Sequence, residues 1–290
     1  MTTPATRNGY ARGALTVHDD PATLTAVTRA LRNAGRKIVL VPTMGALHDG
    51  HRELIRHARK VPGAVVPVVS IFVNPLQFGP NEDLARYPRP LEADLEACRE
   101  EGVELVLTPR VEHMYPPGSQ TRIVAGALGA DLEGASRPGH FDGVLTVVAK
   151  LFHIVGPDVA IFGEKDFQQL ALIKRMVVDL DFGVAVVGVP TVREPDGLAR
   201  SSRNVYLSTE DRARATLLSK ALREGAAVSA YGAEAVLERA REVLADLPVE
   251  YLELRDAETL GPPVPGARAR LLVAAKVGTT RLIDNTNIQL

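Results

Sequence analysis

The chain has 290 residues, of which 46% are hydrophobic and 24% charged, values typical of a globular protein with a substantial buried core. Its formal net charge of −1 lacks the basic excess that accompanies most nucleic-acid binding. A single cysteine, Cys98, excludes an intrachain disulfide and a zinc cluster built from thiolates. The first twenty residues contain no apolar run of the signal-peptide type, and no stretch reaches the roughly 18 apolar residues of a membrane helix. These features predict a cytoplasmic protein.

Short apolar strands alternate with helical stretches between residues 36 and 190. Predicted strands cover residues 37–41, 65–73, 103–107, 159–162 and 185–189, and Pro67 argues against the first half of the second one. Predicted helices cover residues 51–60, 91–101 and 167–180, and apolar residues between 144 and 155 recur at helical spacing. This alternation favours an α/β fold, with a parallel sheet covered by helices on both faces.

The pattern changes after residue 190. A polar loop is followed by Ser208-Thr209-Glu210-Asp211, whose capping-box spacing predicts the start of a helix. Gly225 is predicted to weaken or end that helix, and a second Ala-rich helix reaches about Leu247. Extended segments are predicted at residues 249–254, 269–277 and 280–283. The sequence therefore predicts two domains, residues 1–190 and a smaller α+β domain at residues 191–290.

Four polar, turn-rich segments follow apolar strands. They cover residues 42–51, 74–89, 163–169 and 193–204. Because ligands of an open parallel sheet bind at the carboxyl ends of its strands, these segments are the candidate ligand site.

The first segment contains His48-Asp49-Gly50-His51 at a strand-to-helix turn. Gly50 lets the backbone approach a ligand, and the helix that starts there offers N–H groups to an anion. Imidazoles at His48 and His51 can both donate to phosphate oxygens. Two polar residues that merely cap a helix are the alternative, and a metal site is weaker because no third ligand is near. The chain has no P-loop, dinucleotide or nucleophile-elbow motif, so this turn is the predicted phosphate-binding element.

Two further segments carry groups suited to a nucleotide. Lys165 can hold phosphates and Asp166 a ribose hydroxyl or a metal, although a solvated turn with a salt bridge explains both equally well. Ser201, Ser202 and Arg203 form a run of donors suited to a triphosphate and a departing pyrophosphate. A polar linker between domains is the alternative there.

Amide side chains at Asn74, Gln77 and Gln169 can bind a hydroxy acid through neutral hydrogen bonds, with ordinary loop amides as the alternative. Asp94 lies on a predicted helix and can reach a magnesium ion, although a solvated helix face is the usual role of such a residue. The remaining candidates have no motif around them and are interpreted as structural or solvent-facing: His18, His57, His113, His153 and Cys98.

Several longer strings together resemble one family. They are VPTMGALHDGH, SIFVNPLQFGPNEDLARYPR, FGEKDFQQL, VPTVRE and SSRNVYL, in this order between about Val41 and Leu207, and LLVAAKVGTTRLIDN near the end. The chain resembles the pantothenate synthetase (pantoate–β-alanine ligase) family. That resemblance implies a Rossmann-like nucleotidyltransferase domain at residues 1–190, a C-terminal lid domain at residues 191–290, and a homodimer. It also implies that Mg²⁺ and ATP convert pantoate into a pantoyl adenylate with release of pyrophosphate, and that β-alanine then displaces AMP to give pantothenate.

The resemblance further implies roles for individual residues. The implied ATP site comprises Met44, Gly45, His48, Gly50, His51, Gly163, Lys165, Asp166, Val192, Arg200, Ser201, Ser202 and Arg203. The implied site for pantoate and β-alanine comprises Pro42, Met44, Asn74, Gln77 and Gln169. The implied catalytic residues are His51, His48, Lys165, Ser201, Ser202 and Arg203, with Asp94 as the magnesium contact.

Two positions depart from the family pattern. Arg200 stands where an apolar residue usually precedes the two serines, and Pro195 stands where many members have a small residue. Both lie in the predicted phosphate loop, so they bear on closure of that loop. Two other functions fit parts of the sequence. One is another nucleotidyltransferase, which does not need the amide positions, and the other is a catalytically silent tRNA-binding module, against which the near-neutral charge argues.

Overall fold

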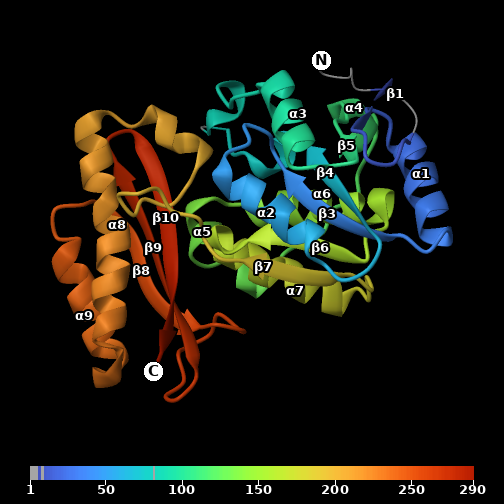
Figure 1. Cartoon of the computed structure of the whole chain (residues 1–290). Helices are drawn as coiled ribbons and strands as arrows, with labels where there is room; N and C mark the ends of the chain where they lie inside the picture. Colours follow the sequence, from blue (N-terminus) through green and yellow to red (C-terminus); the bar gives the residue numbers. More distant parts are fainter. Residues whose placement is uncertain (1–5, 8–9, 81) are drawn as a thin grey trace. The chain divides into compact units, whose positions relative to one another are not determined.

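The computed structural model describes residues 6–7, 10–80 and 82–290 (Figure 1). Asn81, within the predicted segment 74–89, and part of the first twenty residues lie outside the described residues. The chain forms two compact units, the first comprising Met1–Gly163 with Leu172–Val189 and the second Glu164–Ala171 with Pro190–Leu290. The predicted domains and their functional roles stay predictions. The contacts add that Glu164–Ala171 groups with the C-terminal residues, which no sequence signal indicated.

The first unit is built on a seven-stranded parallel sheet. Its spatial order is β1 (Thr6–Arg7), β2 (Thr16–His18), β5 (Leu105–Leu107), β4 (Val65–Ile71), β3 (Lys37–Thr43), β6 (Val159–Gly163) and β7 (Ala185–Val189). The chain proceeds from β3 toward β5 on one side, and from β6 to β7 on the other. The strand order therefore reverses between β3 and β6, the point where sheets of this kind bind ligands at the carboxyl ends of the strands.

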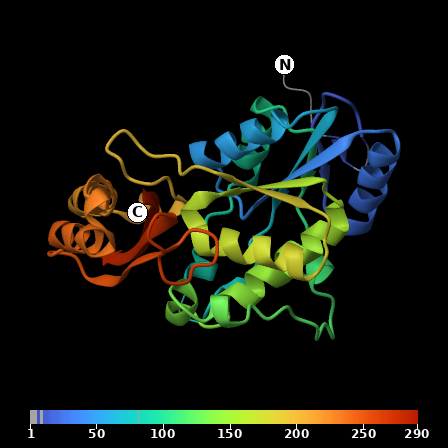
Figure 2. The same cartoon turned by 90° about the horizontal axis from the view of Figure 1, so that it is seen from below.

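Helices cover both faces of this sheet (Figure 2). On one face, α2 (Asp49–Arg59) and α3 (Leu91–Glu100) contribute Leu54, Ile55 and Cys98 to a core with alternate residues of β3 and β4. Two further helices, α1 (Pro21–Asn33) and α6 (His140–Val155), pack against β3 and against each other. The parallel sheet of the predicted α/β fold is confirmed. Helices α4 (Val111–Met114) and α5 (Glu133–Ser136) also belong to this unit, whereas α7 (Phe167–Asp179) begins in the residues grouped with the second unit and continues into the first from Leu172.

Several local predictions differ from the structure in this unit. The strands predicted at residues 37–41 and 103–107 cover Lys37–Thr43 and Leu105–Leu107. Pro67 lies inside β4, opposite Val39 of β3, and it precedes Val68, the first β4 residue paired with β5. Its missing N–H therefore breaks no bond to β5. The same strand ends at Ile71 rather than at residue 73. Helix α2 begins at Asp49, two residues before the predicted start. Strand β2 and helix α1 were not predicted.

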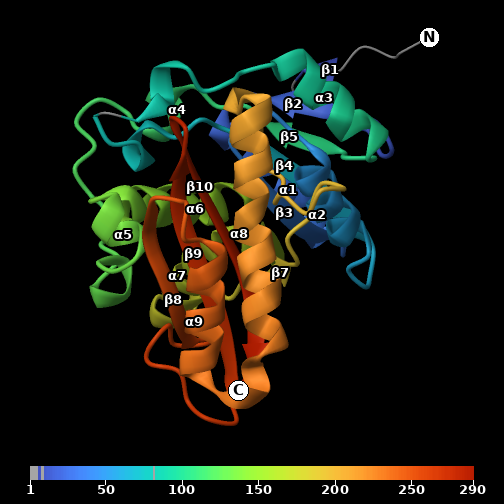
Figure 3. The same cartoon turned by 90° about the vertical axis from the view of Figure 1, so that its left-hand side faces the viewer.

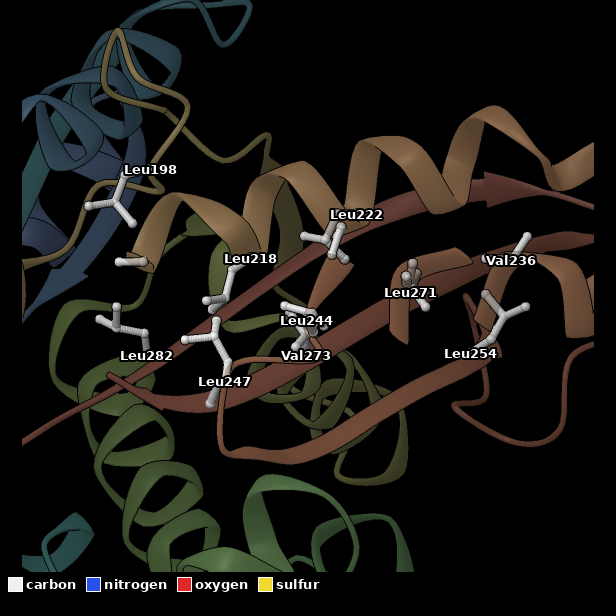
Figure 4. Close-up of a cluster of buried hydrophobic side chains, with 14 of the residues drawn as sticks. Leu198, Leu218, Leu222, Val236, Leu244, Leu247, Leu254, Leu271, Val273 and Leu282 are labelled. Atoms are coloured by element: carbon white, nitrogen blue, oxygen red, sulfur yellow. The ribbon is translucent and has the colours of Figure 1, made fainter. Parts of the chain in front are cut away.

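The second unit contains an antiparallel sheet in the order β10 (Thr280–Gln289), β9 (Arg268–Val277), β8 (Val249–Asp256). Helices α8 (Thr209–Ala227) and α9 (Ala233–Val243) run along one face of this sheet (Figure 3). Side chains including Leu218, Leu222, Val236, Leu271 and Val273 fill the space between helices and strands (Figure 4). This is the predicted α+β arrangement. Strand β10 extends beyond residue 283, and Asp284 and Asn285, the first polar residues of that extension, are buried rather than solvated.

Gly225 does not end its helix. Helix α8 continues to Ala227, and Gly225 is buried within its last turn. A Cβ atom at this position would lie 3.0 Å from the carbonyl oxygen of Val236 and 3.1 Å from Leu271 Cδ2. The glycine therefore permits α8 to pack closely on α9, a tertiary reason that a reading of helix caps cannot detect. Among the described residues, no helix combines the length and the apolar content needed to span a bilayer.

Candidate active site

A tight turn joins β3 to α2 at the carboxyl edge of the parallel sheet. Gly45 and Ala46 both have left-handed backbones, with φ of 80° and 50°. Asp94, at the first turn of α3, accepts hydrogen bonds from the amides of Ala46 (3.0 Å) and Leu47 (2.7 Å). A Cβ atom on Gly45 would lie 2.9 Å from Asp94 Oδ2, so the turn needs glycine there for space as well as for φ.

Asp94 lies beneath this turn and is only 2% exposed. Burial raises the pKa of the Asp94 carboxyl, and the two amide hydrogen bonds act in the opposite direction. Both carboxylate oxygens already accept backbone amides, one each. Among the described residues, no group of three or more His, Cys, Asp or Glu side chains is arranged to hold a metal ion. Asp94 therefore holds the turn through both of its carboxylate oxygens, and its contact with magnesium stays a prediction.

His48 and His51 form a reciprocal cap at the start of α2. The Nδ1 atom of His48 accepts from the amide of Gly50 at 3.1 Å, and the Nδ1 atom of His51 accepts from the amide of His48 at 3.3 Å. The two rings lie 4.1 Å apart between centroids. A nitrogen that accepts an amide proton carries none of its own, so the neutral imidazoles are held as the Nε2–H tautomers. The caps thus orient two Nε2–H donors at a helix N-terminus, where the helix dipole also favours an anion.

Gln77 and Asn74 form a buried amide network after β4. The Nδ2 of Asn74 donates to Gln77 Oε1 at 3.0 Å and to the carbonyl of Gly143 at 3.1 Å. Tyr115, at the end of α4, donates its hydroxyl to Asn74 Oδ1 at 2.8 Å. The Nε2 of Gln77 lies 3.1 Å from the Sδ of Met44. Predicted substrate residues from the two loops that follow β3 and β4 are therefore in contact.

The backbone of Gln77 is also held. Its carbonyl oxygen accepts from the Nδ1 of His140 at 2.8 Å and from Arg137 at 3.3 Å. The Nε2 of His140 in turn accepts from Arg137 at 3.0 Å, so the neutral ring satisfies both neighbours. Burial lowers the pKa of His140 to about 4, and the Arg137 charge acts in the same direction. Arg137 also pairs with Glu82 through two hydrogen bonds, which ties the 74–89 loop to the start of α6.

In the second unit, the turn Glu164–Asp166 is tied to β9 and β10. Arg270 of β9 donates to the carboxylate of Glu164 at 3.0 Å, and its guanidinium lies 4.1 Å from the ring centroid of Phe167. Asn285 of β10 donates to the carbonyl oxygens of Glu164 (3.0 Å) and Lys165 (2.8 Å). Burial lowers the pKa of Arg270, against the pull of Glu164. The amine of Lys165 lies 3.6 Å from the carboxylate of Asp166, the ion pair that the sequence allowed as an alternative.

The segment that contains the two departures from the family pattern has regular local structure. Pro195 occupies the second position of a turn closed by the Gly197 amide and the Glu194 carbonyl, at 2.8 Å. The chain then returns so that the amide of Arg200 bonds the carbonyl of Val192 at 2.9 Å. Ser201 follows as the N-cap of a 3₁₀ turn over Ser202–Tyr206, with its Oγ accepting from the Arg203 amide. Pro195 therefore occupies a turn position that favours proline. Arg200 contributes its backbone amide to the hydrogen bond that pairs the two sides of this loop.

The structure brings together only some of the predicted site residues. Met44, Asn74 and Gln77 are in contact, as are His48 and His51 with Gly50, and Gly45 with Asp94. Pro42 lies within β3 and Gly163 ends β6. Gln169 is on α7 in the residues grouped with the second unit. Sequence reasoning missed Tyr115, Arg137, His140, Arg270 and Asn285. Arg270 carried a signal, since it stands directly before the apolar run Leu271–Ala275.

Comparisons with known proteins agree with this geometry. The family model for pantoate-beta-alanine ligase matches residues 16–287. The pantothenate synthetase of Saccharopolyspora erythraea is 62% identical over 285 residues, which cover 97% of this chain and 94% of that protein. The Mycolicibacterium smegmatis pantothenate synthetase is 62% identical over 282 residues, covering 96% and 89%.

Solved structures show the same relationship. Pantothenate synthetase from Thermus thermophilus superposes with a TM-score of 0.85 at 48% identity, covering 93% of this chain and 98% of that one. Pantoate-beta-alanine ligase from Francisella tularensis, solved as a complex with beta-gamma ATP and beta-alanine, superposes with a TM-score of 0.78 at 35% identity, covering 94% and 97%. The family model and the relatives each span nearly the whole chain. The chain therefore belongs to the pantoate–β-alanine ligase family and is a ligase that forms a carbon–nitrogen bond.

Proposed function

We propose that this ligase condenses pantoate with β-alanine in two steps, using Mg-ATP as a substrate. In the first step, the pantoate carboxylate attacks the α-phosphorus of ATP, which gives pantoyl adenylate and pyrophosphate. In the second, the β-alanine amine attacks the acyl carbon, and AMP leaves as pantothenate forms. Adenylation is needed because a carboxylate is a poor acyl donor, whereas AMP is a good leaving group.

The paired histidine cap is the observation that carries this proposal. Two Nε2–H donors at the N-terminus of α2 suit the charge that develops on phosphate oxygens as the α-phosphorus is attacked. They lie where the turn after β3 enters α2, beside the reversal of strand order. Amide groups of Gln77 and Gln169 suit the neutral recognition of a hydroxy acid. Met44 and Asn74 contact Gln77, and Pro42 is assigned to the same site.

The remaining predicted roles are part of the same proposal. Lys165, Ser201, Ser202 and Arg203 bind the phosphates, and Gly163, Asp166, Val192 and Arg200 contact the nucleotide. Mg²⁺ enters with ATP, because magnesium commonly binds substrate phosphates and waters with few protein ligands. A cytoplasmic homodimer without a nucleic-acid or membrane partner completes the proposal. It agrees with the near-neutral charge of the chain.

The order of product release tests the two steps. Pantoate and Mg-ATP without β-alanine are expected to release about one equivalent of pyrophosphate per active site and no AMP. Adding β-alanine should then start turnover, with AMP and pantothenate in equal amounts. Pyrophosphate that appears only when β-alanine is present would contradict an adenylate formed in a separate first step. Release supported by another acid but not by pantoate would keep the chemistry and change the substrate.

A further inference from the structure

The polarity of the Asn74 amide is fixed by main-chain groups. Its Oδ1 faces the amide of Leu76 at 3.3 Å, and a backbone N–H can only donate. Its Nδ2 faces the carbonyl of Gly143 at 3.1 Å, which can only accept. The two ends of this side chain therefore cannot be exchanged without placing two donors or two acceptors in contact.

The orientation of the Asn74 amide determines which group donates in its hydrogen bonds with Tyr115 and Gln77. Because Oδ1 is an acceptor, Tyr115 must donate its hydroxyl proton to it. Because Nδ2 is a donor, the atom of Gln77 that faces it at 3.0 Å must be the oxygen Oε1. The Nε2 of Gln77 is thereby directed toward Met44, whose thioether sulfur is a weak acceptor that an oxygen of a ligand readily replaces. Asn74 is 1% and Gln77 9% exposed, so water does not compete for these bonds.

We propose that Tyr115 is a positioning residue for pantoate recognition: its hydroxyl holds the Asn74 side chain in place, and Asn74, whose polarity the main chain fixes, directs the NH₂ group of Gln77 toward the substrate. Gln77 then recognises an acceptor oxygen, either of a carboxylate or of a hydroxyl group. Burial raises the pKa of Tyr115, so its hydroxyl keeps the proton that it donates throughout the working pH range. The inference deepens the proposed function and rests on it.

Tyr115→Phe removes only the hydroxyl and leaves the ring beside Phe72 and Arg122. Loss of the hydrogen bond that holds Asn74 against Gln77 is expected to raise the KM for pantoate about tenfold, while the KM for ATP and kcat stay near their wild-type values. Tyr10→Phe is the matched control, since it deletes a tyrosine hydroxyl that bonds Glu104 in the same unit. It should leave the KM for pantoate unchanged. An equal rise in both KM values, or no rise for pantoate, overturns the positioning role.

Two variants of Gln77 separate positioning from polarity. In a Gln77→Ala background, Tyr115→Phe should add no further rise in the KM for pantoate, because its effect passes through the missing amide. An undiminished effect contradicts the relay. Gln77→Glu should bind pantoate more weakly than Gln77→Ala, because it replaces donors by a charged acceptor. If Gln77→Glu instead binds better, Gln77 presents its oxygen and the polarity is wrong. Wild-type protein that shows no dependence on pantoate at all would refute the proposed function itself, and this inference with it.

Discussion

Two loops that carry predicted substrate-binding residues are held by different kinds of bond. In the first unit, neutral groups fix the side chain of Gln77: the Asn74 amide, with Tyr115 and the Gly143 carbonyl behind it. In the second unit, the Glu164–Asp166 turn is held by the buried cation of Arg270 and the amide of Asn285. Deleting one neutral partner costs about 1 kcal/mol, whereas removing half of a buried ion pair costs several times more. Variants of the first loop should therefore change substrate affinity, and variants of the second should change stability.

The largest expected effect is an exception to this comparison. Gly143→Ala alters the packing around the first loop, so it should change stability as well as activity. Gly143 lies in the first turn of α6, and a Cβ atom there would lie 2.2 Å from the carbonyl oxygen of Leu76 and 2.7 Å from the amide of Gln77. Both contacts are backbone, so no side chain can move aside. Gly143→Ala is expected to lower the free energy of unfolding by more than about 3 kcal/mol and to abolish activity. Urea denaturation measures the first effect, and a stable, active variant would show that α6 and the 74–78 segment can separate.

Arg270→Met tests the second half of the comparison, namely that the loop of the second unit is important for stability. The variant leaves the Glu164 carboxylate without its cation and removes the donors to Asn285 and Asn287. We expect a loss of about 3 kcal/mol in the free energy of unfolding of the second unit, and slower turnover because the Lys165 backbone loses its support. Arg281→Met is the matched control on the neighbouring strand, where the ion pair with Glu250 is more exposed and worth at most about 1 kcal/mol. Equal effects of the two variants in urea denaturation would contradict the claim that burial makes the Arg270 pair important.

The His140 ring is expected to make the free energy of unfolding depend on pH. Its pKa is about 4 in the folded protein, against 6.5 for a free histidine, because burial and Arg137 disfavour the charged ring. Between these two values the unfolded chain binds a proton that the folded protein does not, so the stability is complete above pH 6.5 and is lost as the pH falls toward 4. We expect this group to contribute about 2 to 3 kcal/mol of that loss.

Urea midpoints at pH 7, 6 and 5 measure the effect. His140→Asn keeps a donor for the Gln77 carbonyl without a titrating ring, so its stability should fall less over this range than that of the wild-type protein. An identical pH dependence of the two proteins would show that His140 is not the group responsible.

The sequence predicted those features that repeat or that stand in strong local patterns. Alternating strands and helices predicted the parallel sheet, and the H-x-G-H turn predicted a site after β3, where the strand order reverses. The part of Asp94 in holding the turn could not be predicted, because nothing in a helical Glu-x-Asp pattern shows that its carboxylate accepts the amide of Leu47, 47 residues away. Tyr115, Arg137 and His140 act through contacts between distant segments, which have no local signal. Gly225 was expected to weaken or end its helix for the same reason, since the packing partner that requires a glycine lies on another helix.

The histidine cap carries the central claim, and a matched pair of variants at His51 tests it. The side-chain oxygen of Asn in His51→Asn can replace the Nδ1 acceptor that caps the His48 amide, but this variant lacks the Nε2–H donor. The longer side chain of Gln in His51→Gln can place an N–H near the Nε2 position. Pyrophosphate release in a single turnover from Mg-ATP and pantoate is expected to slow about 100- to 1,000-fold in His51→Asn and clearly less in His51→Gln, with both proteins folded. Near wild-type release by folded His51→Asn would contradict the account, because the proposed donor to the phosphate would then have no part in adenylation.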